Sequence, residues 1–113
     1  MEVQGKEDNG ITVISPIGRV DTSTAKLFEE GVLKFIKDNG QQVVISFSSI
    51  DYISSAGLRV IVMTGKKLAS LKGKLALIDM APKIQEVFKM SGVDKIIKIY
   101  PNLQTARTEF GAA

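Results

Sequence analysis

Residues 43–62 read VVISFSSIDYISSAGLRVIV, and this stretch decides the predicted fold. The mainly apolar, β-branched run at 43–47 predicts a short strand that is buried on both faces. A polar loop follows it, and from Ser54 and Ser55 onward apolar residues recur at helical spacing. The two serines therefore stand where helix N–H groups and the positive end of the helix dipole would stabilise an added anion.

Similar patterns extend from this stretch in both directions. Strands are expected in a segment closed by the turn Asp8-Asn9-Gly10, and at 11–17, 43–47, 75–78 and 96–100. Pro16 places the 11–17 strand at an edge or a bulge of the sheet. Helices are expected from an Asp21 or Thr22 cap to Asn39-Gly40, from Ser54 or Ser55 to Gly73, from Ala81-Pro82 to Ser91-Gly92, and from an Asn102 or Thr105 cap through Phe110.

Strands that alternate with helices after an initial hairpin predict an α/β fold with a mixed sheet. We expect four to five strands packed with about four α-helices. Because the chain has 113 residues and no internal repeat or linker, residues 1–113 are expected to form one domain.

Composition narrows the classes of protein to consider. The chain contains no histidine and no cysteine, which excludes disulfides and thiolate zinc sites and fits a reducing compartment. A run of about 18 apolar residues is absent, so no membrane span is expected, and the acidic N-terminal stretch lacks an apolar signal segment. We expect a cytoplasmic protein. The net charge is only +3, and no aromatic residues interleave the lysines at 66, 67, 72 and 74, so direct nucleic-acid binding is not expected.

Catalysis is also disfavoured. A serine nucleophile needs a base within hydrogen-bond reach, and the usual histidine is missing. Neither Ser54 nor Ser55 has the Ser-x-x-Lys spacing or the Gly-x-Ser-x-Gly elbow. Glu29, Glu30 and Asp51 form no metal-ligand pattern. We therefore predict a protein that is not an enzyme and that has no catalytic, cofactor or metal site.

The serines have two interpretations that the sequence leaves open. Serines at a loop-to-helix junction are most often caps, worth about 1 kcal/mol each. Alternatively, a hydroxyl in the first turn is a target that another protein modifies, and both roles can coexist with Ser54 as the cap and Ser55 exposed. Ala56 and Gly57 are equally open, because small residues permit close approach of a partner and also tight packing of a helix on a sheet.

Four segments in order resemble the STAS domain family, as found in bacterial anti-sigma factor antagonists. The segment Ile53-Ser54-Ser55-Ala56-Gly57-Leu58 resembles the family's Asp-Ser-Ser/Thr-Gly-Leu signature. The other three similarities are Gly18-Arg19-Val20-Asp21 before the first helix, 43–50 as the central strand and loop, and 77–93 as a later strand and its helix. The resemblance covers nearly the whole chain.

The resemblance implies a regulator that binds an anti-sigma factor with serine kinase activity and thereby frees a sigma factor. Phosphorylation by that kinase would end the complex, and a serine phosphatase would restore it. The phosphoacceptor carries over to Ser55, with Ser54 as second choice, because Ser54 and Ala56 replace the family's usual neighbours. The expected partner-binding residues are Asp21, Thr22, Ser54, Ala56, Gly57 and Arg59.

Two other functions compete with this one. A STAS module without a switch would serve as a scaffold subunit of a signalling assembly or of a lipid-transport complex, with the serines only as caps. Small-ligand or nucleotide binding has little support, because Gly57 and Gly65-Lys66-Lys67 do not have the spacing of a P-loop.

Overall fold

The structure is a computed structural model that describes residues 1–37 and 39–111. Within these residues the strands are β1 (Glu2–Asp8), β2 (Ile11–Val20), β3 (Gln42–Ser46), β4 (Ile50–Ile53), β5 (Lys74–Ile78) and β6 (Lys98–Ile99). The helices in the same residues are α1 (Ala25–Leu33), α2 (Ser55–Ser70), α3 (Pro82–Ser91), the 3₁₀ turn η1 (Val93–Lys95) and α4 (Leu103–Gly111). The expected α/β class, with four α-helices and a mixed sheet, is confirmed.

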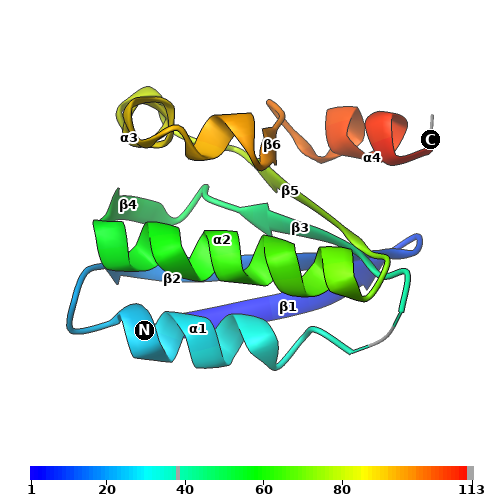
Figure 1. The fold of residues 1–113 in the computed structure, drawn as a ribbon, viewed down its shortest axis with the longest axis horizontal. Helices are drawn as coiled ribbons and strands as arrows, with labels where there is room; N and C mark the ends of the chain where they lie inside the picture. The colour runs from blue at the N-terminus through cyan, green and yellow to red at the C-terminus, as the bar shows by residue number, and fades with distance from the viewer. Residues whose placement is uncertain (38, 112–113) are drawn as a thin grey trace.

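The strands form one mixed sheet in the order β1-β2-β3-β5-β6, and β4 pairs with β2 away from this path (Figure 1). Only β1 runs antiparallel to its neighbour, and the other pairs are parallel. The described residues thus contain six strands where four to five were expected. The difference is β4, because its polar residues Asp51 and Tyr52 are exposed and read as a loop in the sequence.

The hairpin between β1 and β2 forms as predicted. Asp8 pairs with Ile11, so the turn has two residues. These are Asn9 and Gly10, with φ of 49° and 88°. Positive φ at both positions is the geometry that matches the twist of the flanking strands, and Asn-Gly adopts it readily.

Strand β2 changes partner along its length. Residues 11–14 pair with β3, whereas Gly18–Val20 pair with β4. Pro16 lies between these two stretches, opposite Val3 of β1, where β2 has no parallel neighbour. Residues 11–14 therefore lie inside the sheet, between β1 and β3, whereas Pro16 has a neighbouring strand on one side only, and an irregularity of the expected kind follows between Gly18 and Arg19. Proline has no N–H to donate, and it is tolerated here because no parallel strand lies beside this position to accept such a bond.

The sheet is covered on both faces. Helices α1 and α2 lie side by side over one face (Figure 1), and α4 packs on the other. The core under α1, α2 and α3 includes Ile14, Val20, Phe28, Val32, Ile45, Phe47, Ile61, Leu77 and Phe88. The core under α4 comprises Ile11, Val13, Val44, Ala76, Ile78, Ala106 and Phe110. Among the described residues, no helix combines the length and the apolar character that crossing a membrane requires.

Some element ends differ from expectation. Helix α1 ends at Leu33 rather than at Asn39-Gly40, and residues 34–37 after it form a turn and a loop. The last strand is only Lys98–Ile99, because Val93–Lys95 forms a 3₁₀ turn and Ile96 is 64% exposed. One helix stop and one helix start are as predicted: Gly92 ends α3 with φ of 81°, and the Asn102 side chain caps the start of α4 by accepting from the Thr105 N–H at 2.8 Å.

Candidate functional site

The candidate site lies where β2 and β4 end next to each other. Val20 pairs with Ile53 in the parallel register, so the residues that follow both strands leave the sheet at the same edge. The Ser54 N–H then donates to the Val20 carbonyl oxygen at 2.8 Å. This bond fixes the start of α2 beside the turn that begins at Asp21.

The two serines have different environments. Ser54 is the N-cap of α2, with extended backbone geometry, and its Oγ accepts from the Gly57 N–H at 3.4 Å. Ser54 is half-buried, whereas Ser55, the first residue of α2, is exposed. The first turn of α2 contains no acidic residue, so nothing there competes with an added anion for the helix N–H groups. The hydroxyl of Ser55 is therefore accessible at a position that favours negative charge.

Asp21 organises the turn that precedes α1. Its Oδ1 accepts from the Ser23 N–H at 2.9 Å, from the Ser23 hydroxyl at 2.7 Å and from the Thr24 N–H at 3.1 Å. The Arg19 Nε–H donates to the other carboxylate oxygen, Oδ2, at 3.1 Å. These bonds lower the pKa of Asp21 from 3.8 to about 2, the hydrogen bond from the Ser23 side chain contributing most.

The expectation that Asp21 or Thr22 caps the first helix needs correction. Helix α1 starts at Ala25, and its N-cap position is Thr24, whose side chain makes no cap bond. The Thr24 hydroxyl instead donates to the Arg19 carbonyl at 2.7 Å. Asp21 thus stabilises the turn before the helix, and Thr22 is exposed at the tip of that turn. The reason is that the turn takes three residues, which moves the helix start further along the chain.

Of the remaining predicted site residues, some lie at the surface and one lies in the interior. Arg59 is exposed one helical turn after Ser55, and Ala56 is half-buried. Gly57 is buried, and a Cβ built on it would lie 2.6 Å from Val20 Cγ1 and 2.7 Å from Ile53 Cγ1. Gly57 therefore lies behind the surface, where its small size lets α2 approach the sheet.

Sequence reasoning missed one contact in this region. The Arg19 guanidinium carbon lies 4.0 Å from the centroid of the Tyr52 ring, which is the geometry of a cation–π contact. Both side chains are accessible, Tyr52 at 40%. The contact depends on the pairing of Arg19 with Tyr52 across β2 and β4. Because Ile50–Ile53 was expected to be a loop, neither this pairing nor the contact was predicted.

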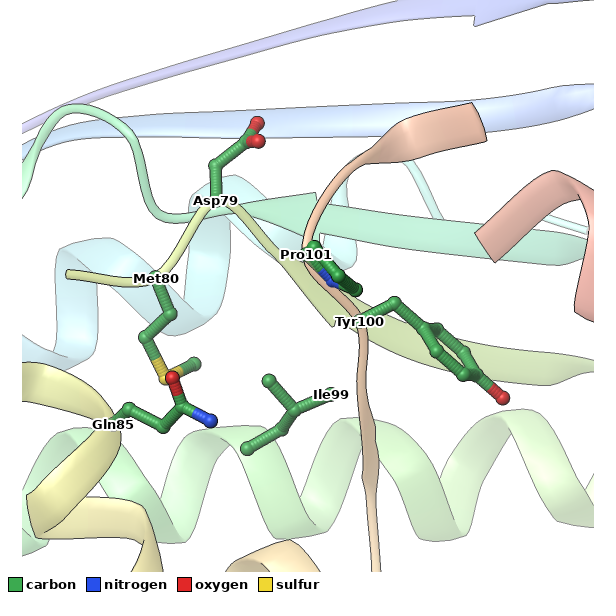
Figure 2. Close-up of a pocket in the computed structure, with 6 residues that line it drawn as sticks. All are labelled: Asp79, Met80, Gln85, Ile99, Tyr100 and Pro101. Carbon is green, nitrogen blue, oxygen red and sulfur yellow. The ribbon is translucent and has the colours of Figure 1, made fainter. Parts of the chain in front are cut away.

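A separate hollow of about 320 Å³ lies at the ends of β5 and β6 and is lined by Asp79, Met80, Gln85, Ile99, Tyr100 and Pro101 (Figure 2). In Figure 2 the Asp79 carboxylate points away from the side chains of Met80 and Gln85. It accepts the Ser46 hydroxyl at 2.9 Å. The pKa of Tyr100 is raised by burial and by the negative charge of Glu109. None of the predicted site residues lines this hollow.

In residues 1–37 and 39–111, no three acidic side chains come close enough together to hold a metal ion. The site at the ends of β2 and β4 carries hydroxyls, one carboxylate and cationic side chains on its surface. This chemistry suits recognition by another protein and modification of a hydroxyl.

Comparisons with known proteins show the family and the fold of the chain. Residues 2–106 match the family model described as "STAS domain". The chain is 30% identical over 105 residues to BtrV of Bordetella bronchiseptica, covering 93% of this chain and 90% of that protein. It is 26% identical over 102 residues to the anti-sigma-F factor antagonist RsfB of Mycobacterium tuberculosis, covering 90% and 83%. A crystal structure of an anti-sigma factor antagonist from Mycobacterium paratuberculosis superimposes with a TM-score of 0.85, at 26% identity and with 96% and 92% of the chains covered.

Proposed function

Because the chain belongs to the STAS domain family, we propose that it is an anti-sigma factor antagonist that is switched by phosphorylation of Ser55. In this proposal it binds an anti-sigma factor with serine kinase activity and so releases a sigma factor. The kinase then phosphorylates Ser55, the complex dissociates, and a serine phosphatase restores the binding form. The name of RsfB supports the antagonist role, and the chain covers most of that relative.

The exposure of Ser55 carries the phosphorylation part of the proposal. Ser54 provides the helix cap, so the Ser55 hydroxyl is left at the surface for a kinase to reach. Ser54 is the weaker acceptor because it is half-buried and engaged with the Gly57 N–H. The role of Ser55 is that of a substrate hydroxyl, and no catalytic function of the chain's own is proposed.

The partner-binding surface in this proposal surrounds Ser55. It comprises Asp21, Thr22, Ser54, Ala56 and Arg59 at the ends of β2 and β4. We add the accessible pair of Arg19 and Tyr52, which flanks the same edge of the sheet. We give Gly57 a packing role beneath this surface, because a Cβ at this position would lie 2.6 Å from Val20 Cγ1 and 2.7 Å from Ile53 Cγ1.

A phosphate on Ser55 would act mainly on binding. Phosphoserine carries about −1.5 to −2 charges at neutral pH. Within the protein, the helix dipole offsets this charge by roughly 0.3–1 kcal/mol, and Arg59 lies one turn away on the same side of α2. Inside a packed interface, an unmatched buried charge costs about 2–5 kcal/mol. Since about 1.4 kcal/mol is tenfold in affinity, the partner would dissociate while the fold persists.

A pull-down from the source bacterium tests this function. Tagged wild-type protein and the Ser55→Asp variant serve as parallel baits, and the Ser54→Asn variant serves as a control that retains a capping side chain. We expect a kinase of the GHKL type to be captured by wild type and Ser54→Asn and to be reduced with Ser55→Asp. Capture of a transport ATPase or a signalling scaffold, equally by all three baits, would instead identify the scaffold module without a switch.

A further inference from the structure

Strand β1 forms an edge of the sheet. It is seven residues long and pairs with β2 along its entire length, and it is the terminal strand of the sheet order. A long edge strand presents a row of backbone N–H and C=O groups that can pair with another strand. Among the described residues, no strand covers this outer edge.

The edge is held firmly from one face by α1, which lies along β1 (Figure 1). The Val3 side chain fills the space beside Gly31, and Phe35 occupies the space beside Gly5; a Cβ on either glycine would come within 2.5 Å of these side chains. Alternate residues of β1 point to opposite faces. Val3 and Gly5 therefore face α1, and Glu2, Gln4 and Lys6 face the other way and are exposed.

We propose that β1 pairs with β1 of a second copy of this chain, antiparallel and centred on Gln4. Opposite residues in an antiparallel pair lie on the same face. This register places Glu2 opposite Lys6 of the second copy, and the two-fold symmetry repeats the pair. It also places Gln4 opposite Gln4, and Val3 opposite Gly5 on the face of α1. The charges of the strand are thus complementary to their own reversed copy.

The neighbouring registers are less favourable. A shift of one residue would turn side chains to the wrong face, so the alternatives differ by two. Centring the pair on Gly5 sets Glu2 opposite Asp8 and loses both ion pairs. Centring it on Val3 sets Glu2 opposite Gln4 and shortens the paired segment. Of these three registers, only the one centred on Gln4 matches opposite charges twice, and cross-strand pairs of like charge are destabilising.

This association goes beyond the proposed function and does not depend on it. The register pairs only Glu2–Lys6 of each strand, which buries a small area, so a reversible dimer of low affinity is expected. Sedimentation velocity from about 10 µM to about 1 mM covers the corresponding range of dissociation constants. Wild type is expected to shift from the mass of one chain to that of two across this range.

A charge-swap experiment tests the register. Glu2→Lys alone sets two ammonium groups opposite each other in each cross-strand pair, and Lys6→Glu alone sets two carboxylates opposite each other. Each single variant is therefore expected to dimerise at least about tenfold more weakly than wild type. An equimolar mixture of the two single variants provides a mixed dimer in which neither charge sign is in excess, and the double variant restores opposite charges in both pairs.

The double variant is expected to dimerise like wild type. In the mixed dimer, one cross-strand pair joins the two original side chains and the other joins the two replaced side chains, each pair being of opposite charge, so the mixture is expected to dimerise about as well as wild type. Lys66→Glu, which makes the same charge change at an exposed position on α2, is expected to leave the dimer unchanged.

Circular dichroism of every variant establishes that the fold is retained. A wild-type protein that stays at the mass of one chain at all concentrations would overturn the proposal. So would a dimer that both single variants leave intact, or single variants that lose the dimer while the double variant fails to restore it.

Discussion

The backbone N–H of Ser54 donates to the carbonyl oxygen of Val20 at 2.8 Å, and this bond joins the end of β4 to the end of β2. It brings the first turn of α2 next to the turn at Asp21, although more than thirty residues separate them in the sequence. The candidate site therefore depends on the short strand β4 and on close packing of α2.

Gly57→Ala should destabilise the protein because its methyl group would come within 2.7 Å of Val20 and Ile53. Overpacking of a core typically costs about 1–3 kcal/mol, and the higher helix propensity of alanine returns at most about 1 kcal/mol. We expect a net loss of about 1–2 kcal/mol in urea unfolding. Gly111→Ala, where a Cβ meets nothing within 4 Å, is the control and should be neutral or slightly stabilising. Equal stability of Gly57→Ala and wild type would contradict the packing role.

The two serines should differ in stability when replaced by alanine. Ser54→Ala removes a cap bond that is long, at 3.4 Å, so we expect a loss of roughly 0.5–1 kcal/mol. Ser55→Ala changes an exposed side chain and should stay within about 0.5 kcal/mol of wild type. Urea unfolding of the two variants measures this difference. A larger loss for Ser55→Ala would show that Ser55, not Ser54, is the structural cap.

Asp21 should titrate at unusually low pH. Its pKa is lowered from 3.8 to about 2, chiefly by the hydrogen bond from Ser23. A lowered pKa means that the ionised form favours the folded state: this stabilisation is fully present above pH 3.8 and is lost as the pH falls through about 2. The carboxyl carbon of Asp21, followed by NMR, should therefore show a midpoint near 2. A midpoint at the ordinary value would mean that the turn is open in solution.

The negative charge of a Ser55→Asp variant should leave the fold intact. The added carboxylate lies in the first turn of α2, which has no acidic residue, so the helix dipole should accommodate it. We expect a melting temperature within about 4 °C of wild type. Calorimetry measures it, with Lys66→Asp in the later part of the helix as a comparison. Loss of the folded signal in Ser55→Asp would make any effect on binding a consequence of unfolding.

A hairpin turn and a helix stop, which depend on neighbouring residues, were predicted from the sequence. The pairing of strands that are far apart in the sequence was not. The Asn9-Gly10 hairpin and the Gly92 stop follow from the conformations that these residues adopt easily, and both formed as expected. Ile50–Ile53 has only one neighbouring strand among the described residues, the second half of β2, and no local signal in the sequence indicates a pairing that distant. The contact of Arg19 with Tyr52 was missed for the same reason, because it forms only when β4 pairs with β2.

The sequence predicted where the candidate site lies along the chain, but it did not predict how the residues of the site are arranged. The apolar residues that recur at helical spacing after Ser54 and Ser55 indicated a helix start, and the structure places Ser54 at the cap and Ser55 in the first turn. The composition of the turn at Asp21 did not reveal that α1 begins only at Ala25, because Asp21 and the residues after it can cap a turn or a helix equally well. The burial of Gly57 was also undecided until Val20 and Ile53 were known to lie against it.

Phosphate mapping tests whether Ser55 is the residue that the kinase modifies. The protein is incubated with ATP and the anti-sigma factor kinase captured from the source bacterium, and the modified residue is identified by mass spectrometry, with Ser54→Ala and Ser55→Ala treated in parallel. We expect one phosphate on Ser55, retained in Ser54→Ala and lost in Ser55→Ala. Phosphate on Ser54 or on a residue outside the first turn of α2, or no phosphate in the presence of an active kinase, would contradict this expectation.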